Sequence, residues 1–258
     1  MPHKILMPLL SVTLLLVMLL SACSTAAPAP AATNTSMPQP TATNTAVPTK
    51  TSTPTRTPRP TVTPNLAATQ QMSDWQAEAQ TYFDKGYLNS VDGKFKKIDD
   101  FSYEWAQLGW YDMIPVGVSA TDFFISGHLK WSSAYQNADT SGCGYVFSLQ
   151  KDFDHYAVFL DRSEVLFLIT SDQRGRRAGP TRGNGHVKFG NPAEADFTVI
   201  VKDNYAYALV DGEVVGEYTL AQSRSLTGQI ALSVLSGTNK DYGTRCEMTN
   251  LHVWTPTD

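Results

Sequence analysis

Beyond residue 94 the chain carries short runs of apolar residues that are bounded by polar turn residues. These runs are rich in β-branched and aromatic residues, a composition typical of β-strands. We expect strands at residues 101–107, 122–131, 144–149, 154–160, 165–170, 197–202, 205–210, 214–220, 229–235 and 245–254. Turn signals such as Asp203-Asn204 and Asp211-Gly212 separate them. Many short strands with regular turns predict an all-β fold, a two-sheet antiparallel sandwich.

Residues 66–83 carry a helical pattern instead. Apolar side chains recur there at helical spacing, at Met72, Trp75, Ala79 and Phe83. Ser73 and Asp74 are candidate caps near its start. We therefore expect a short N-terminal amphipathic helix that leads into the sandwich and packs on it.

The first 22 residues have the composition of an export signal. A short basic start precedes an apolar run at residues 5–20, which is too short to read as a spanning helix, and small residues follow. The ending Leu20-Ser21-Ala22-Cys23 resembles the lipobox of bacterial lipoproteins, and this resemblance implies cleavage before Cys23 and its lipid modification. We expect an extracytoplasmic protein, lipid-anchored to the bacterial cell membrane or outer membrane. An ordinary secretory signal is the alternative.

Residues 23–65 repeat Thr-Pro pairs, most densely at 53–64. Proline fixes its own φ and pushes the preceding residue into extended conformations, and almost no residue here has apolar surface to bury. We expect a disordered, polyproline-like stalk that begins at the lipidated cysteine. At ~3.1 Å per residue, such a stalk holds a domain on the order of 100 Å from the membrane. The remainder, 66–258, is long enough for one domain with a substantial core.

Export also bears on the two remaining cysteines, Cys143 and Cys246. In an oxidising compartment a lone pair of cysteines usually forms a disulfide. The alternatives, a metal site or a reactive thiol, lack a neighbouring histidine or a CxxC partner. We therefore predict a Cys143–Cys246 disulfide. The net charge of -4 and the pI of about 5.7 argue against a nucleic-acid partner.

Five segments of the β-rich region carry recognisable motifs, and their order along the chain is informative. They are 144–147, 154–159, 207–215, 226–232 and 248–254. Together they resemble the concanavalin A-like lectin/glucanase jelly roll, in the form of laminin-G-like and bacterial surface modules. The resemblance covers residues 95–256 and implies a jelly-roll sandwich. Met248-Thr249 stands where Phe-Asp is usual in that family, so a polar or metal-binding role for that Asp is not carried over.

Catalytic motifs are not found in the sequence. Enzymes of that fold that cleave β-glucans use Glu-x-Asp-x-x-Glu on one strand, which turns alternate side chains into the cleft. This chain has only Glu194-Ala195-Asp196, which we expect in a solvated loop. Other acidic pairs, Asp99-Asp100 and Asp152/Asp154, cannot be placed relative to a cleft from sequence alone. A Gly-x-Ser-x-Gly elbow, His-Glu-x-x-His and a phosphate-binding loop are also missing.

Four histidines are isolated along the sequence, at His128, His155, His186 and His252. We expect them to have structural or surface roles rather than to bind a metal. The sequence thus predicts no catalytic residue, no metal site and no cofactor. Backbone carbonyl ligands leave no residue signature, so a structural calcium ion stays open.

One cluster of positive charge stands out, at Arg174, Arg176 and Arg177. It lies in residues 172–185, which are rich in glycine and which we expect to form a long loop. Because guanidinium groups bind carboxylate, sulfate or phosphate bidentately, an acidic polysaccharide is a candidate ligand. A flexible, solvated loop is the alternative.

Aromatic and amide side chains supply further candidates for ligand binding. Trp110, Tyr111 and Tyr135 flank turns, where an exposed ring can stack on a sugar, although packing in the core explains aromatic residues equally well. Asn239 lies in a polar segment, 236–243, that can hydrogen-bond hydroxyl groups or simply form a hairpin turn.

These observations favour a surface-tethered, non-catalytic module that binds carbohydrate or another envelope component. Two alternatives stay open at this point. One is a glycoside-acting hydrolase of the concanavalin A-like fold, which needs a carboxylate pair in a cleft. The other is a structural or protein-binding display domain, which needs a flat apolar patch.

Overall fold

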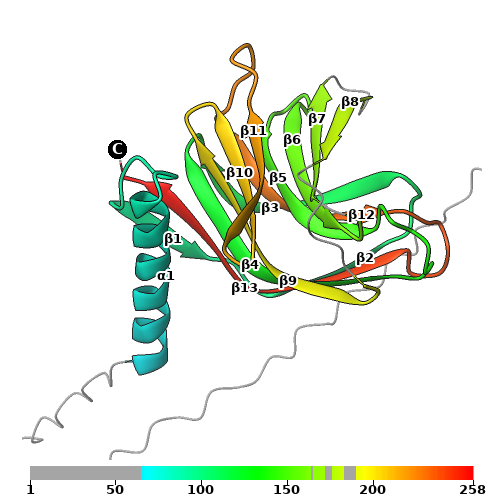
Figure 1. Cartoon of the computed structure of the whole chain (residues 1–258), viewed down its shortest axis with the longest axis horizontal. Helices are drawn as coiled ribbons and strands as arrows, with labels where there is room; N and C mark the ends of the chain where they lie inside the picture. The colour runs from blue at the N-terminus through cyan, green and yellow to red at the C-terminus, as the bar shows by residue number, and fades with distance from the viewer. Residues whose placement is uncertain (1–64, 164, 172–175, 183–189, 258) are drawn as a thin grey trace, which may run out of the picture. The chain divides into compact units, whose positions relative to one another are not determined.

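The computed structural model describes residues 65–163, 165–171, 176–182 and 190–257. Within these ranges the chain forms two antiparallel β-sheets packed face to face, with the helix α1 (Leu66–Asp84) beside them (Figure 1). The two-sheet sandwich with a short N-terminal helix, predicted from the pattern of the sequence, is confirmed. The signal peptide expected at 1–22 and all but the last residue of the stalk expected at 23–65 lie outside the described residues.

Sheet A has seven strands in the order β1-β13-β4-β9-β10-β11, with β2 also paired to β13. They are β1 (Gly93–Lys97), β2 (Phe101–Trp105), β4 (Phe123–Ser133), β9 (Ala193–Lys202), β10 (Tyr205–Val210), β11 (Glu213–Thr219) and β13 (Thr244–Pro256). Sheet B has six strands in the order β3-β12-β5-β6-β7-β8. They are β3 (Trp110–Ala120), β5 (Gly142–Leu149), β6 (His155–Asp161), β7 (Val165–Ser171), β8 (Arg176–Arg182) and β12 (Gly228–Ser236).

Three of these strands, β1, β3 and β8, are not predicted by the sequence pattern, and each lies at the edge of its sheet. β3 contains Pro115 and Gly117, which an edge strand tolerates because one side of its backbone makes no ladder hydrogen bonds. β1 is rich in lysine, which protects an exposed edge from further pairing. The loop expected at 172–185 is wrong for residues 176–182, because pairing with β7 holds this Pro-containing segment as strand β8.

Helix α1 follows Asn65, whose side-chain oxygen accepts a hydrogen bond from the Ala68 N–H at 3.2 Å. Asn65 is therefore the cap, and the caps expected at Ser73 and Asp74 are wrong, since both residues lie inside the helix. The expected bounds, 66–83, nevertheless agree with the observed Leu66–Asp84.

The buried face of α1 consists of Trp75, Ala79 and Tyr82. The apolar stripe expected from the sequence is thus only half right, because Met72 and Phe83 are 39% and 40% exposed. Tyr82 occupies the buried position that Phe83 was expected to take. Its hydroxyl lies 3.2 Å from Thr198 Oγ1 on β9, so the sheet supplies a polar partner that only a tyrosine can use.

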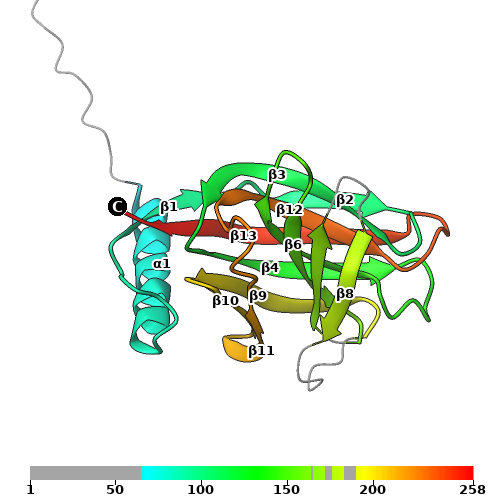
Figure 2. The ribbon, with the colours of Figure 1, turned by 90° about the horizontal axis from the view of Figure 1, so that it is seen from above.

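Sheet B is strongly rolled. The Tyr111 hydroxyl on β3 lies 2.6 Å from His155 Nε2 on β6, although β12 and β5 stand between these strands. In a flat sheet three strand spacings amount to about 14 Å, which a tyrosine side chain cannot bridge. Figure 2 shows β6 and β8 crossing the direction of β3 and β12 steeply. The concave face of sheet B is consequently filled by its own apolar residues, at Val146, Ala157, Phe159, Leu166, Leu168, Ala231 and Leu235.

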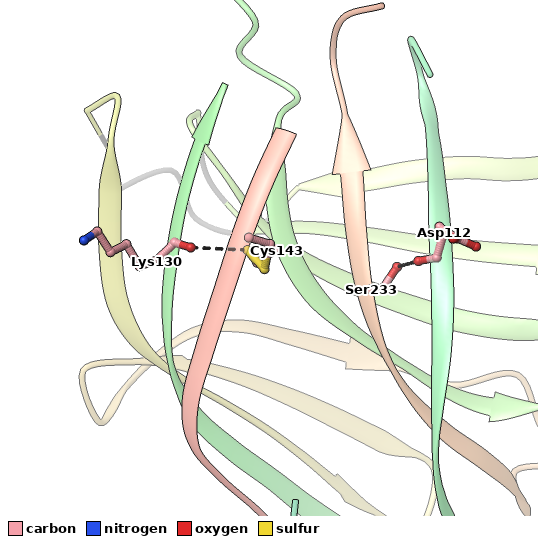
Figure 3. The surroundings of a disulfide bond; sticks show 5 residues. Asp112, Lys130, Cys143 and Ser233 are labelled. Carbon is pink, nitrogen blue, oxygen red and sulfur yellow. Dashed lines mark hydrogen bonds between the residues drawn. A yellow bond between two sulfur atoms is a disulfide. The ribbon is translucent and has the colours of Figure 1, made fainter. Parts of the chain in front are cut away.

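A disulfide joins Cys143 on β5 to Cys246 on β13, with an S–S distance of 1.99 Å and 5.9 Å between the Cα atoms. The predicted pairing is confirmed, and it links sheet B to sheet A (Figure 3). Gly144 beside it is required by close approach, because a Cβ there would collide with the Val158 carbonyl of β6. The bond also lies beside the Lys130 carbonyl of β4, 3.9 Å from Cys143 Sγ.

Candidate functional site

The sequence-predicted ligand residues separate into two groups in the structure. Trp110, Tyr135 and Asn239 gather where the segments 106–109, 134–141 and 237–243 meet, which we call the loop end. Tyr111 crosses the concave face of sheet B toward Thr170 on β7. On β8, the backbone of Arg176 pairs with Ser171 of β7, and the backbone of Arg177 pairs with Thr170 of β7. Arg174 and the lipidation candidate Cys23 lie outside the described residues.

At the loop end, Trp110 and Tyr135 are 51% and 39% exposed. The Asn239 amide and the Tyr135 ring already have contacts within the protein. The Asn239 side-chain oxygen accepts a hydrogen bond from the Leu108 N–H at 2.5 Å, and Lys240 Nζ lies 4.4 Å from the ring centre of Tyr135. The loop end therefore offers two exposed aromatic rings to a ligand. The Asn239 amide and one face of the Tyr135 ring, however, already make contacts that hold the loops together.

A cavity of about 510 Å³ opens at the other end of β6. It is lined by polar and charged side chains from two segments, the β5–β6 turn and the connection between β11 and β12: Gln150, Lys151, Asp152, Asp154, Ser223, Arg224 and Ser225. We call this cavity the Arg224 pocket. Cavities of this size are typical of small-molecule sites. Of the two acidic pairs that the sequence could not place, Asp152/Asp154 thus lines this cavity, and Asp99-Asp100 does not.

The first wall of the Arg224 pocket is a tight turn. The Gln150 N–H donates to the Asp154 carbonyl at 2.9 Å, and the Phe153 N–H donates to the Gln150 carbonyl at 3.1 Å. Asp152 Oδ1 accepts a hydrogen bond from the Asp154 N–H at 3.2 Å. Phe153 has φ 66° and is 57% exposed, an uncommon backbone conformation for a bulky residue. Such local strain concentrates at functional sites.

The second wall is formed by Arg224, whose side chain is only 15% exposed. Its Nη2 donates to the Thr170 carbonyl at 2.6 Å and lies 3.4 Å from Asp154 Oδ2. The guanidinium also lies over the Tyr156 ring, 5.2 Å from its centre. These three contacts fix the orientation of the guanidinium before any ligand arrives.

A crosslink holds the two walls together. Gln150 Nε2 donates to the Thr227 carbonyl at 2.8 Å, which joins the turn to the segment that carries Arg224. Ser148 Oγ donates to the Leu226 carbonyl at 2.7 Å, one residue away. The pocket is therefore built from rigid walls rather than from isolated surface side chains.

His155 lies directly behind the turn and is 3% exposed. Its Nδ1 is 2.6 Å from the Phe153 carbonyl, which can only accept, so Nδ1 carries the proton. Burial lowers the pKa of His155 below its ordinary value of 6.5, and the nearby charge of Arg224 acts in the same direction. The imidazole is therefore neutral at pH 7, and its Nε2 accepts the hydrogen bond from the Tyr111 hydroxyl.

The sequence suggested that the acidic fragment Glu194-Ala195-Asp196 lies in a loop. This expectation is wrong, because β9 already begins at Ala193 and includes the fragment. Glu194 and Asp196 alternate toward solvent on this strand. Asp196 Oδ1 lies 2.8 Å from His128 Nδ1 on β4. Neither carboxylate lines the Arg224 pocket.

In the part of the chain that the structure describes, no group of three or more His, Cys, Asp or Glu side chains is placed to hold a metal ion. No helix of the same residues is long and apolar enough to cross a membrane. Five residues that line the Arg224 pocket were not among the sequence candidates: Gln150, Lys151, Ser223, Arg224 and Ser225. Only the neighbouring acidic pair gave a signal, since a single arginine between two serines has no motif.

No protein-family model matches the chain, and no curated protein matches it. Several solved structures are similar in fold. A carbohydrate binding module, CBM66, from Bacillus subtilis is 12% identical, with 64% of this chain and 97% of that chain covered and a TM-score of 0.43. A beta-fructofuranosidase from Aspergillus kawachii, complexed with glycerol, is 14% identical (66% and 28% covered, TM-score 0.44). Sheep galectin-11, also complexed with glycerol, is 8% identical (57% and 98% covered, TM-score 0.35).

Proposed function

We propose that this chain is a surface-tethered, non-catalytic module that binds carbohydrate in the Arg224 pocket. The observation that carries the proposal is a cavity of about 510 Å³ in which Asp152, Asp154 and Arg224 are held by contacts within the protein. Preorganised polar groups reduce the entropy that binding must offset.

The lining of the pocket suits a ligand that is rich in hydroxyl groups. A sugar hydroxyl both donates and accepts, and the pocket presents acceptors at Asp152 and Asp154 and donors at Lys151 and Arg224. These four formal charges cancel, which favours a neutral saccharide over a polyanion. The exposed ring of Phe153 belongs to the same turn and offers an apolar surface to a sugar face.

A glycan array with residues 24–258, with and without calcium, tests the proposal. Saturable binding to one class of glycan supports it, and time-dependent loss of the bound glycan identifies a hydrolase instead. An array without binding contradicts the proposal and favours a display domain. The calcium arm decides whether a structural ion contributes.

The variant Arg224→Ala locates the ligand site. Hydrogen bonds to charged groups contribute about 1.5–3 kcal/mol, so we expect the affinity to fall by about tenfold or more. Arg245→Ala is the matched control, because Arg245 pairs with Glu104 at 2.7 Å on sheet A, away from the pocket lining. An isothermal titration with the best array glycan measures both variants.

The sequence-predicted arginine cluster gives the competing location. Replacing Arg174, Arg176 and Arg177 together by Ala leaves binding unchanged if the ligand is neutral and sits in the Arg224 pocket. Loss of salt-sensitive binding in this triple variant, with Arg224→Ala unaffected, would move the site to the cluster and the ligand to an acidic polysaccharide.

We further propose that Cys23 carries the lipid anchor and that residues 24–65 form the stalk. The basis is the lipobox-like ending and the Thr-Pro repeats of the sequence. Cys23→Ala should release the protein from the membrane fraction into the medium or the periplasm. Unchanged partitioning of this variant in cell fractionation would reject lipid anchoring.

A further inference from the structure

One phenol hydroxyl lies at the junction of both walls of the Arg224 pocket. The hydroxyl of Tyr111 is 2.6 Å from His155 Nε2 and 2.8 Å from Thr170 Oγ1. We call these three residues the Tyr111 network. They come from β3, β6 and β7, and none of them lines the pocket.

Each bond of the Tyr111 hydroxyl leads to a different wall. His155 Nδ1 donates to the carbonyl of Phe153, which closes the turn that presents Asp152 and Asp154. Thr170 uses its carbonyl to accept the hydrogen bond from Arg224. The Tyr111 hydroxyl thus contacts one residue that bonds to each wall: His155 for the turn and Thr170 for Arg224.

The directions of these hydrogen bonds follow from the neutral imidazole. Because Nδ1 carries the proton, Nε2 accepts, and the Tyr111 O–H must donate to it. The Tyr111 oxygen is then the acceptor for the Thr170 O–H. The Tyr111 ring also packs on Phe159 at 5.2 Å between ring centres, so the side chain is held along its length.

We propose that Tyr111, His155 and Thr170 are positioning residues that hold the two walls of the Arg224 pocket in register, so that saccharide affinity depends on a hydroxyl that does not touch the ligand. This inference rests on the function proposed above. It assigns Tyr111 a role different from the direct sugar stacking expected from the sequence.

Protonation of His155 should weaken the same arrangement. With both ring nitrogens protonated, Nε2 can only donate to the Tyr111 oxygen, so the hydrogen bond that the Tyr111 O–H donates to His155 is lost. The charged and titratable groups that face His155 are Tyr111 on β3, Arg224 on the β11–β12 connection and the adjacent Asp154. Arg224 opposes a second positive charge here, so acid should lower the affinity for a saccharide.

Tyr111→Phe tests the proposal, because it removes the hydroxyl and keeps the ring. Tyr145→Phe is the matched control: its hydroxyl is also buried and donates to the Phe197 carbonyl at 3.2 Å, in the core between the sheets. Two readouts are measured on residues 24–258, which retain every described residue. One is the affinity for the best array glycan, and the other is amide hydrogen exchange of residues 150–154 and 221–227 without ligand.

We expect Tyr111→Phe to weaken the affinity about fivefold and to speed exchange in both segments, whereas Tyr145→Phe changes neither. Unchanged exchange in either segment, or equal effects of the two variants, would overturn the proposal. If no glycan binds the wild type, the proposed function fails, and the exchange data still decide whether the hydroxyl couples the walls. Should Tyr111→Phe not fold, Thr170→Val removes the second bond of the same hydroxyl and is held to the same two readouts.

Discussion

Two networks among the described residues are built around a buried histidine, and they differ in what surrounds the ring. In the Tyr111 network, His155 faces a phenol, a carbonyl and the guanidinium of Arg224. Below α1, His252 is 1% exposed, and its Nε2 lies 2.8 Å from the carboxylate of Glu78. From Glu78 this second network, which we call the helix network, continues through Tyr82 to Thr198.

Packing differs as much as charge. Trp75 stacks on His252 with 4.5 Å between ring centres, and α1 covers an apolar cluster that includes Phe124 and Trp254. The Tyr111 network instead lies next to an open cavity. The difference indicates that the helix network fastens α1 to sheet A, whereas the Tyr111 network shapes a surface for a ligand.

The substitution with the largest expected effect disrupts the helix network and leaves the Tyr111 network intact. Trp75→Ala removes a ring that is 5% exposed, and such truncations cost about 3–5 kcal/mol of unfolding free energy. Urea denaturation measures this loss. The exchange of residues 150–154 should not change, and a change there would show that the two regions are not independent.

Replacing the carboxylate has a smaller effect. Glu78→Gln leaves the His252 ring without its charged partner, and we expect a loss of about 1–3 kcal/mol at pH 7. Burial tends to raise the pKa of Glu78, but hydrogen bonds and charge from His252, with hydrogen bonds from Tyr82 and Ser126, lower it overall from 4.5.

This lowered pKa fixes the pH dependence of the helix network. The contribution of Glu78 to stability is complete above pH 4.5 and is lost as the pH falls through the lowered pKa of the folded state. Urea midpoints between pH 3 and pH 7 should therefore converge for wild type and Glu78→Gln toward acid. A constant difference over this range would contradict the assignment.

The smallest effect on stability is expected from the titration of His155. Because burial lowers its pKa below 6.5, the unfolded chain binds this proton more readily, and stability falls as the pH drops from 6.5 through the folded-state pKa. His155→Gln should remove this dependence, as seen in urea midpoints between pH 5 and pH 7. Equal pH dependence in wild type and variant would assign the titration to another group.

The sequence predicts the interior strands of both sheets but only some of the edge strands, of which β11 is one that it does predict. The interior strands of both sheets, such as β4 and β12, follow from their runs of β-branched and aromatic residues. The edge strands β1, β3 and β8 do not, because lysine, glycine and proline replace the strand-favouring residues there. An edge needs only one partner, so its sequence is less constrained.

The candidate site was predictable only in part. Asp152 and Asp154 were visible as an acidic pair, yet Arg224 lies 70 residues beyond Asp154 and meets this pair only through the fold. Tyr111 was singled out for its position beside a turn, but its contacts with His155 and Thr170 depend on how sheet B rolls.

The sequence by itself determined the two-sheet sandwich, the presence of α1 and the Cys143–Cys246 disulfide. Short runs of β-branched and aromatic residues and a lone pair of cysteines are features that can be read along the chain. The rolling of sheet B, the edge strands, the buried face of α1 and the Arg224 pocket were decided only by the tertiary structure. Each depends on contacts between segments far apart in the chain, and local periodicity carries no information about which of these segments meet.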